Sequence, residues 1–178
     1  MSSMLPLMRV SSAGPLRDPV NLPSTYSRQV VKSALELRYS LLAYFYSLFY
    51  EAKSTGVPVA RPMFFEFSTD DWTWTIDEQF MIGPALMASP ALYKDTVTVH
   101  VYLPNDTIWY HFIGGHQINN KDTGSLVTIT SLIKEMVLLL RGGYIVPYQV
   151  SWPMVSRSQF HVASVIMSFI SKDNNFVT

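Results

Sequence analysis

Cysteine is missing from all 178 residues of the chain. Its absence excludes disulfide bonds, thiolate metal sites and a cysteine nucleophile. An excess of one charge is missing as well, because thirteen basic residues balance thirteen acidic ones, and no basic patch predicts nucleic-acid binding. The uncharged stretch from Tyr39 to Tyr50 is shorter than the ~20 apolar residues of a membrane-spanning helix, so no transmembrane segment is expected.

Several motifs of enzyme chemistry are also absent. The chain has no GxSxG, P-loop or GxGxxG sequence. Its histidines, His100, His111, His116 and His161, are not spaced as a metal site. No cofactor and no metal ion are therefore expected. The first twenty residues lack the continuous apolar core of a signal peptide, so the sequence leaves the compartment open.

One long helix is predicted to begin near Thr25. Ser24 or Thr25 is a suitable N-cap, Lys53 falls in the last turn, Gly56 suits the position after the helix, and Pro58 follows. Within this helix, Tyr39 to Tyr50 is apolar or aromatic on nearly every side, which predicts that protein surrounds it.

A strand is expected after the helix. Val57 to Phe67 is rich in strand-forming residues, but Pro58 and Pro62 cannot sit inside a central strand, so Met63 to Phe67 is its best-formed part. A helix followed by such a strand is half of a βαβ unit, whose partners must lie elsewhere.

The second half of the chain predicts a small β-domain. Phe80 to Leu92 is apolar and broken by Gly and Pro, which suggests short strands. Alternating residues from Val97 to Leu103 and from Ile108 to Phe112 predict a hairpin. Further strands are expected at Leu126–Ile129, Met136–Leu140 and Tyr144–Val146, with a turn at Gly142–Gly143 and one more strand within His161–Ile170.

Four blocks in order carry a resemblance: LRYSLLAYFYSLFYEA, TGVPVARPMFFEF, WTIDEQFMIGPALMASPAL and RGGYIVPYQ. Together with a Trp109-Tyr110 pair, they resemble the glycoside hydrolase family 31 α-glucosidases, over about Thr25 to Gln149. The resemblance implies an α+β chain: the last helix and strand of a (β/α)8 catalytic barrel, then the proximal antiparallel β-sandwich. The sequence Ser131 to Glu135 departs from the family, which more often has Pro-Leu-Asp there.

The resemblance also implies retaining hydrolysis by two aspartates, a nucleophile and an acid. In the family the nucleophile sits in a Trp-x-Asp-Met-Asn-Glu motif upstream of this helix, and the acid in another upstream segment. Neither occurs here, so no catalytic residue is assigned. Asp70, Asp71, Asp77 and Glu78 are adjacent acids of a polar loop and are interpreted as solvated, and Glu66 is considered only because barrel strands end in catalytic groups.

Two residues are candidate sites. Met4 to Arg9 is similar to the family segment that runs into an Arg-Asn-His-Asn motif, which makes Arg9 a candidate for substrate binding. Val10, Ser11 and Ser12 follow instead of the Asn and His. Asn105 opens an Asn-Asp-Thr glycosylation sequon, which matters only in the secretory route; the family is usually lysosomal, in the endoplasmic reticulum, or secreted.

The expected organisation has four parts. Residues 1–24 are unassigned and expected to be poorly ordered, 25–79 form the last barrel segment, 80–150 the proximal β-sandwich, and 151–178 a tail with one strand.

The expected function is part of a retaining α-glucosidase that removes terminal α-linked glucose. The chain alone is expected to be inactive, and to meet α-glucosides only within the full-length enzyme. Exposed barrel surface would favour self-association. The alternatives are a non-catalytic carbohydrate-binding or interaction module, or a truncated product without activity.

Overall fold

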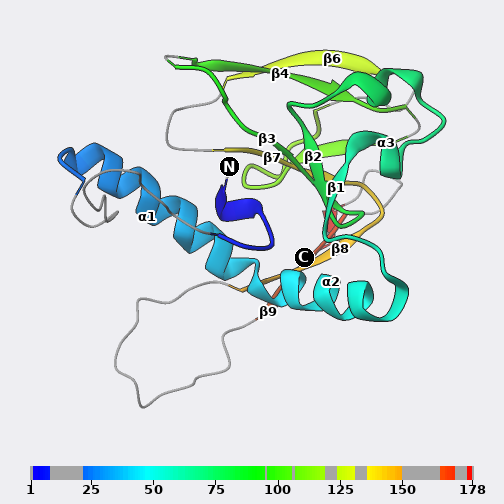
Figure 1. The fold of residues 1–178 in the computed structure, drawn as a ribbon, viewed down its shortest axis with the longest axis horizontal. Helices are drawn as coiled ribbons and strands as arrows, with labels where there is room; N and C mark the ends of the chain where they lie inside the picture. Colours follow the sequence, from blue (N-terminus) through cyan, green and yellow to red (C-terminus); the bar gives the residue numbers. More distant parts are fainter. Residues whose placement is uncertain are drawn as a thin grey trace.

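The helices and strands of this chain are arranged in layers around one antiparallel sheet (Figure 1). The computed structural model describes residues 2–8, 22–94, 96–105, 107–118, 124–130 and 136–149, together with the backbone of 165–170 and 176–177. No helix among these residues is both long and apolar enough to cross a membrane.

The predicted ends of the long helix are confirmed. The first helix, α1 (Thr25–Ser40), begins after Ser24, whose Oγ accepts a hydrogen bond from the Ser27 amide at 3.4 Å. The second helix, α2 (Leu42–Thr55), ends at Gly56, which has a φ of 77°. Only glycine adopts this left-handed conformation readily, and it stops the helix there.

The helix is not continuous, however. Leu41 separates α1 from α2 with φ −92° and ψ 4°, outside helical geometry, and the two segments point in different directions (Figure 1). Leu41 is fully buried. Neither proline nor glycine marks the break in the sequence; it coincides with a side chain packed in the core.

The prediction that protein surrounds Tyr39 to Tyr50 is wrong for this structure. One side of α2 is buried through Tyr44, Phe45 and Leu48, but Tyr46 and Tyr50 on the other side are 78% and 73% exposed. Half of the aromatic surface therefore has no cover from the described residues.

The strand predicted at Met63 to Phe67 is also wrong. The strand β1 is Ala60–Pro62, and Met63–Glu66 forms a helical turn, α3, closed by a hydrogen bond from the Phe67 amide to the Met63 carbonyl. Aromatic residues favour strands only where neighbouring strands support them. Here β1 has β2 on one side, and the turn returns Glu66 toward Arg61.

The central sheet has five strands in the order β1-β2-β3-β7-β5, each antiparallel to its neighbours. The new members are β2 (Phe80–Ile82), β3 (Leu86–Ser89), β5 (Trp109–His111) and β7 (Val137–Arg141). A second sheet pairs β4 (Thr98–Leu103) with β6 (Ser125–Thr130), and a third joins β8 (Ile145–Gln149), β9 (Val165–Ile170) and β10 (Phe176–Val177). Two short 3-10 helices, η1 (Ser2–Met4) and η3 (Asp71–Thr75), complete the fold. The expected α+β class with antiparallel sheets is confirmed.

The predicted strands exist, but the predicted hairpin is wrong. β4 pairs with β6, where Val101 lies opposite Val127, whereas β5 pairs with β7. Alternation of side chains shows that a segment is a strand but does not show its partner. β5 is covered on both faces, because Trp109 and Tyr110 are both buried in opposite halves of the core.

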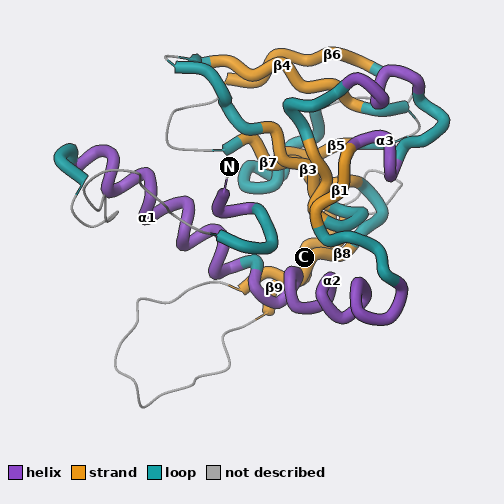
Figure 2. The backbone as a smooth tube through the Cα atoms, in the orientation of Figure 1, coloured by secondary structure: helices purple, strands orange, loops and turns teal. Residues whose placement is uncertain are grey.

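The central sheet separates two halves of the core. Successive residues of β7 alternate between them: Leu138 and Leu140 face α2, whereas Leu139 packs with Trp109 and the inner side of β4. Figure 2 shows the result, with the β4–β6 pair above the central sheet and α2 below it.

The beginning of the chain is part of this core. Residues 2–8 were expected within a poorly ordered arm, but Met4 is fully buried. The Nη1 of Arg38 donates to the carbonyls of Ser3 and Leu5, both at 2.7 Å, and its Nη2 donates to that of Pro6 at 3.1 Å. A single guanidinium thus binds three backbone carbonyls of this segment and holds it against α1.

Candidate functional site

A cluster of charged side chains joins the helical segment to the central sheet. Arg61 of β1 is 5% exposed and donates its Nε to the Pro58 carbonyl at 2.7 Å. Its Nη1 binds Glu66, and its Nη2 lies 3.6 Å from Glu51 Oε1 on α2. Arg141, at the end of β7, lies 3.5 Å from the other oxygen of Glu66. We call Glu51, Arg61, Glu66 and Arg141 the Glu66 cluster.

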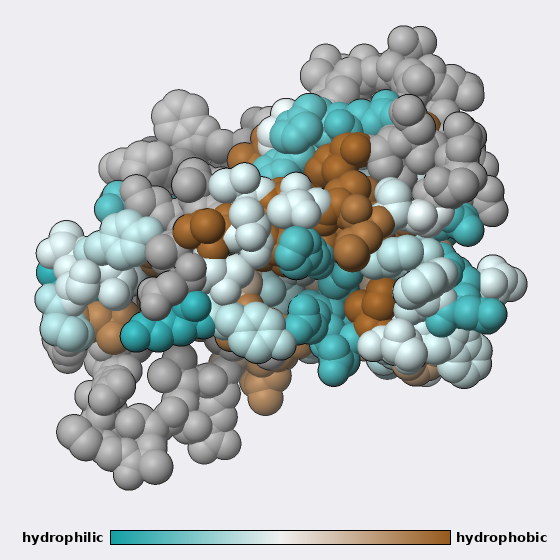
Figure 3. Space-filling view, turned by 90° about the horizontal axis from the view of Figure 1, so that it is seen from above, coloured by the Kyte–Doolittle hydropathy of each residue, from teal (hydrophilic) through white to brown (hydrophobic). Residues whose placement is uncertain are grey.

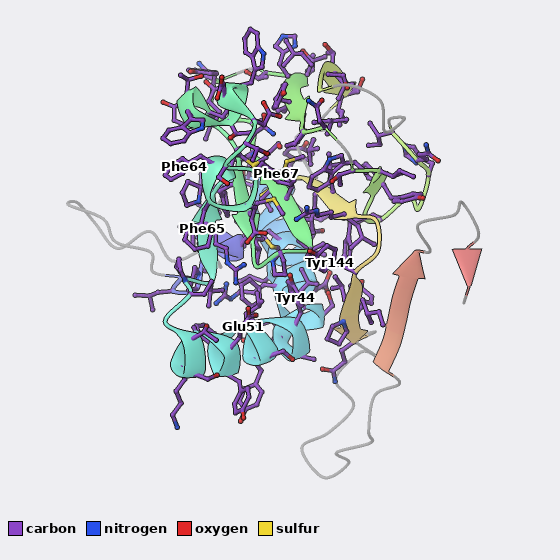
Figure 4. The ribbon with its side chains drawn as sticks, turned by 90° about the vertical axis from the view of Figure 1, so that its right-hand side faces the viewer. Tyr44, Glu51, Phe64, Phe65, Phe67 and Tyr144 are labelled. Carbon is purple, nitrogen blue, oxygen red and sulfur yellow. The ribbon has the colours of Figure 1, made fainter. Side chains whose placement is uncertain are left out.

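Aromatic rings cover the two arginines of the Glu66 cluster. The Arg61 guanidinium lies 5.8 Å from the Phe65 ring centroid, and that of Arg141 lies 4.5 Å from Phe67 and 5.3 Å from Tyr144. Phe65 and Phe67 belong to the α3 turn and its cap, and Tyr144 comes just before β8; Figure 4 shows the three rings, with Glu51 on α2. Stacking of this kind suits arginine, whose planar cation is weakly hydrated.

The geometry of Glu66 does not suit catalysis. A general acid or nucleophile must reach a reacting atom, but both oxygens of Glu66 already face guanidinium groups and its side chain is only 12% exposed. Its role is to bridge β1 and β7 through two ion pairs.

The loop carboxylates also have structural partners. Asp70 caps η3 by accepting from the Trp72 amide at 3.2 Å, and accepts from the Tyr102 hydroxyl at 2.8 Å. Glu78 accepts from the Tyr93 hydroxyl at 2.7 Å. Asp71 and Asp77 are exposed. Asp71 and Asp77 thus agree with the interpretation of the loop acids as solvated, whereas Asp70 and Glu78 have structural partners that the interpretation did not include.

Tyr44 connects α2 to the central sheet through hydrogen bonds. Its hydroxyl donates to the Ile82 carbonyl at 2.8 Å and accepts from the Ala85 amide at 3.3 Å. Burial raises the pKa of the Tyr44 phenol well above its usual value. Gly83 lies against it with a φ of 58°, where an added Cβ would clash with a Leu48 methyl carbon and the Tyr44 hydroxyl, so a side chain at this turn would strain the backbone and displace these two side chains.

Gln79, in the loop before β2, forms hydrogen bonds with the backbone of β4. Its amide oxygen accepts from the Tyr102 amide at 2.8 Å, and its Nε2 donates to the Tyr102 carbonyl at 3.0 Å. The side chain thereby acts like a neighbouring strand. Burial, followed by the hydrogen bond to Asp70, raises the pKa of Tyr102 to about 12.

A surface hollow of about 470 Å³ lies beside β1. Its walls come from Leu5, from β1, and from the segment between Trp74 and Phe80. Trp74 is 61% exposed and stacks on Phe64, with ring centroids 5.8 Å apart and planes inclined by 22°. Figure 4 places Phe64 at the edge of the molecule, above Phe65.

The remaining sequence candidates are placed as follows. Arg9 and His161 lie outside the described residues, as do Ser131 to Glu135. Asn105 is exposed in the turn after β4. The rings of His111 and His116 stack 5.1 Å apart. Within the described part of the chain, no group of three or more His, Asp or Glu side chains is placed to hold a metal ion.

Sequence reasoning missed the Glu66 cluster. A usable signal was present, because Arg61 and Arg141 each stand within an otherwise apolar stretch. An arginine predicted to lie on a buried strand requires an anionic partner. Glu66 was the nearest acid in sequence to Arg61, but its connection to Arg141 depends on strand pairing that the sequence did not reveal.

Curated proteins are similar to this chain in sequence. Probable maltase-glucoamylase 2 of Homo sapiens is 38% identical over 133 residues, which cover 75% of this chain and 5% of that protein. An α-glucosidase of Hordeum vulgare is 38% identical over 134 residues, or 74% of this chain and 15% of the relative. An uncharacterized family 31 glucosidase of Schizosaccharomyces pombe is 38% identical over 146 residues, which cover 81% of this chain and 14% of that protein. The chain thus spans less than a fifth of these relatives.

Solved structures share the fold. The chain matches a Flavobacterium johnsoniae dextranase complexed with glucose with a TM-score of 0.78 and 23% identity, over 92% of this chain and 19% of that one. It matches a glucosidase II alpha subunit with a TM-score of 0.73 and 28% identity, over 78% of this chain and 15% of that one. The model of the glycosyl hydrolase family 31 C-terminal domain matches residues 56–146. The chain therefore belongs to glycosyl hydrolase family 31, of which it carries the C-terminal domain.

Proposed function

We propose that this chain is the C-terminal part of a retaining α-glucosidase, in which it closes and braces a (β/α)8 barrel without supplying catalytic carboxylates. α1, α2 and β1 are then the last barrel elements, followed by the proximal β-sandwich from about residue 80. The substrate, terminal α-linked glucose, is met only by the complete enzyme.

The observation that carries this proposal is the exposed side of the helices. Leu42, Tyr46, Phe49 and Tyr50 follow helical spacing along α2, and with Tyr39 at the end of α1 they are 42–78% exposed; we call these five residues the aromatic face. Burial of one such side chain is worth about 1.5–3 kcal/mol, and contiguous exposed apolar surface of this kind marks an interface. A barrel that contacts these helices would supply the cover.

A second observation supports the same proposal. β1 is an edge strand of the five-stranded sheet and pairs with β2. That pairing is antiparallel, and the other edge of β1 pairs with no other described strand, so it is open to a strand from another part of the protein.

The carboxylates of the described residues support the lack of activity. Retaining glycosidases need two carboxyl groups about 5–5.5 Å apart on either side of the glycosidic bond. Glu66, Asp70 and Glu78 instead have the structural partners described above.

The test is the native length of the polypeptide, determined by mass spectrometry of peptides from source material separated by size. We expect these peptides to migrate with a chain several times longer than 20.2 kDa that includes a Trp-x-Asp-Met-Asn-Glu segment. Migration near the size of the isolated chain contradicts the proposal. Turnover of an α-glucoside by the purified 178-residue chain at the rate of a complete enzyme contradicts the lack of activity.

A non-catalytic carbohydrate-binding or interaction module is the second candidate, favoured by the exposed Trp72 and Trp74. Such a module folds without further cover. A monodisperse chain that does not bind hydrophobic dye would favour it, whereas dye binding or aggregation would favour the bracing role.

Asn105 remains a proposed glycosylation site. Its exposed position in the turn after β4 leaves room for a glycan. A mass shift on glycosidase treatment of source material, lost in Asn105→Gln, would establish it.

A further inference from the structure

The hollow beside β1 has the size of a ligand site. At about 470 Å³ it falls within the ~300–1,000 Å³ of small-molecule pockets, which suits one or two sugar rings. It is lined by all three residues of β1 and by Phe64 of the α3 turn.

One wall of the hollow is aromatic. Trp74 is 61% exposed, and Phe64 behind it is 40% exposed. Because Phe64 stacks nearly parallel to the Trp74 ring, the indole has a defined orientation without being buried. A supported flat ring matches the apolar C–H face of a pyranose, which buries a large area at little cost in side-chain freedom.

The polar groups of the hollow differ in availability. Gln79 is occupied by both backbone groups of Tyr102, and Arg61 by Glu66 and the Pro58 carbonyl. These two form fixed walls. Asp77 is exposed, and no side chain among the described residues donates a hydrogen bond to its carboxylate. A carboxylate beside an aromatic ring disfavours phosphate and other anions, but accepts hydrogen bonds from hydroxyl groups.

We propose that this hollow binds a glucosyl ring of an α-linked glucoside, with Trp74 stacked on the ring and Asp77 accepting from its hydroxyls. The identity of the sugar rests on the proposed function. The hollow gives the C-terminal part a direct role in holding the sugar chain, in addition to bracing the barrel.

The chain offers a matched control. Trp72 is two residues away and 73% exposed, but it lies against Tyr102, with ring centroids 6.4 Å apart, and is not part of the hollow. Removing either indole exposes little new core. A difference between the two variants therefore reports the hollow rather than the general loss of a tryptophan.

The experiment is ligand-observed saturation-transfer NMR on the 178-residue chain with maltose, and with sorbitol as an acyclic polyol. We expect saturable maltose binding with a Kd of about 1 mM, weakened at least about tenfold by Trp74→Ala and less than about twofold by Trp72→Ala. Asp77→Asn should weaken binding less than Trp74→Ala does, and sorbitol should not compete.

Three results would overturn the site: no saturable binding up to about 50 mM maltose, equal losses in the two tryptophan variants, or no loss in Trp74→Ala. Circular dichroism of each variant confirms that the fold is retained. The outcome is separate from that of the bracing proposal. If the native chain is near 20.2 kDa and binds maltose through Trp74, the sugar site is supported and the bracing role is contradicted. If the native chain is long and shows no such binding, the bracing role is supported and the sugar site is contradicted.

Discussion

The sheet and the helices of this chain treat their apolar side chains differently. All four residues of β3 and the first four of β7 are buried, because α2 covers one side of the central sheet and the β4–β6 pair covers the other. The helix α2 buries one side, α1 buries only Ser40, and the aromatic face is left exposed. Within the described residues both faces of the central sheet are covered, whereas the helices leave apolar side chains exposed.

The outer β4–β6 layer also has one side that faces outward, and its side chains are arranged differently from those of the aromatic face. Figure 3 views the molecule from this side, where hydrophobic side chains gather in the middle of the view with hydrophilic ones around them. Along β6, half-buried residues alternate with exposed ones. On α2, by contrast, Tyr46, Phe49 and Tyr50 are all exposed aromatic residues. Between them only Ser47 is exposed and polar, because Leu48 points into the core.

Breaking the connection between helices and sheet should have the largest effect. Glu66→Gln keeps the side-chain volume but leaves the Arg61 and Arg141 guanidinium groups without their shared carboxylate, so we expect the free energy of unfolding to fall by about 3–5 kcal/mol. Urea denaturation measures it. The control is Glu36→Gln, whose pair with Lys32 at 3.8 Å is exposed and should cost less than about 0.5 kcal/mol. Equal losses in the two variants would contradict a structural role for the Glu66 cluster.

The two sides of α2 can be compared with the same substitution. Tyr44→Phe removes a hydroxyl that binds the Ile82 carbonyl and the Ala85 amide, leaving buried groups unpaired at a cost of about 1–3 kcal/mol. Tyr46→Phe, on the aromatic face at 78% exposure, should change the stability by less than about 0.5 kcal/mol. If Tyr46→Phe is the more damaging, the assignment of buried and exposed sides is wrong.

Charge on the aromatic face should change association rather than stability. Exposed barrel surface was expected to favour self-association, which we propose occurs through this face. Introducing Tyr46→Glu and Tyr50→Glu together should weaken association of the 178-residue chain at least about tenfold, or about 1.4 kcal/mol, in sedimentation velocity. The control pair Trp72→Glu and Tyr93→Glu lies on other exposed positions. A control that weakens association as much would move the interface elsewhere.

The sequence was informative wherever a feature depends on neighbouring residues. Ser24 and Gly56 act at the helix ends through local backbone geometry, and each predicted strand of the β-domain up to residue 149 was found within a few residues of its place. Features that depend on distant partners were not predictable. The break at Leu41 coincides with core packing, the α3 turn with the ion pairs of Glu66, and the β4–β6 pairing with the cover over Trp109. The aromatic face was recognised as apolar, but its exposure depends on what this chain does not itself supply.

The smallest expected effect concerns pH and the β-rich part. Burial and the Asp70 hydrogen bond raise the pKa of Tyr102 to about 12, above the 10.0 of an unperturbed tyrosine. The neutral phenol therefore stabilises the fold fully below pH ~10, and this contribution is lost as the pH rises from ~10 toward ~12, because the unfolded chain ionises first. In Tyr102→Phe the decline of the melting temperature across this window should be shallower than in the parent chain, although Tyr44 and Tyr110, whose pKa values burial also raises, keep part of it. A decline of unchanged slope would show that Tyr102 ionises alike in the folded and unfolded chains, and that the contact between η3 and β4 opens before the sheet does.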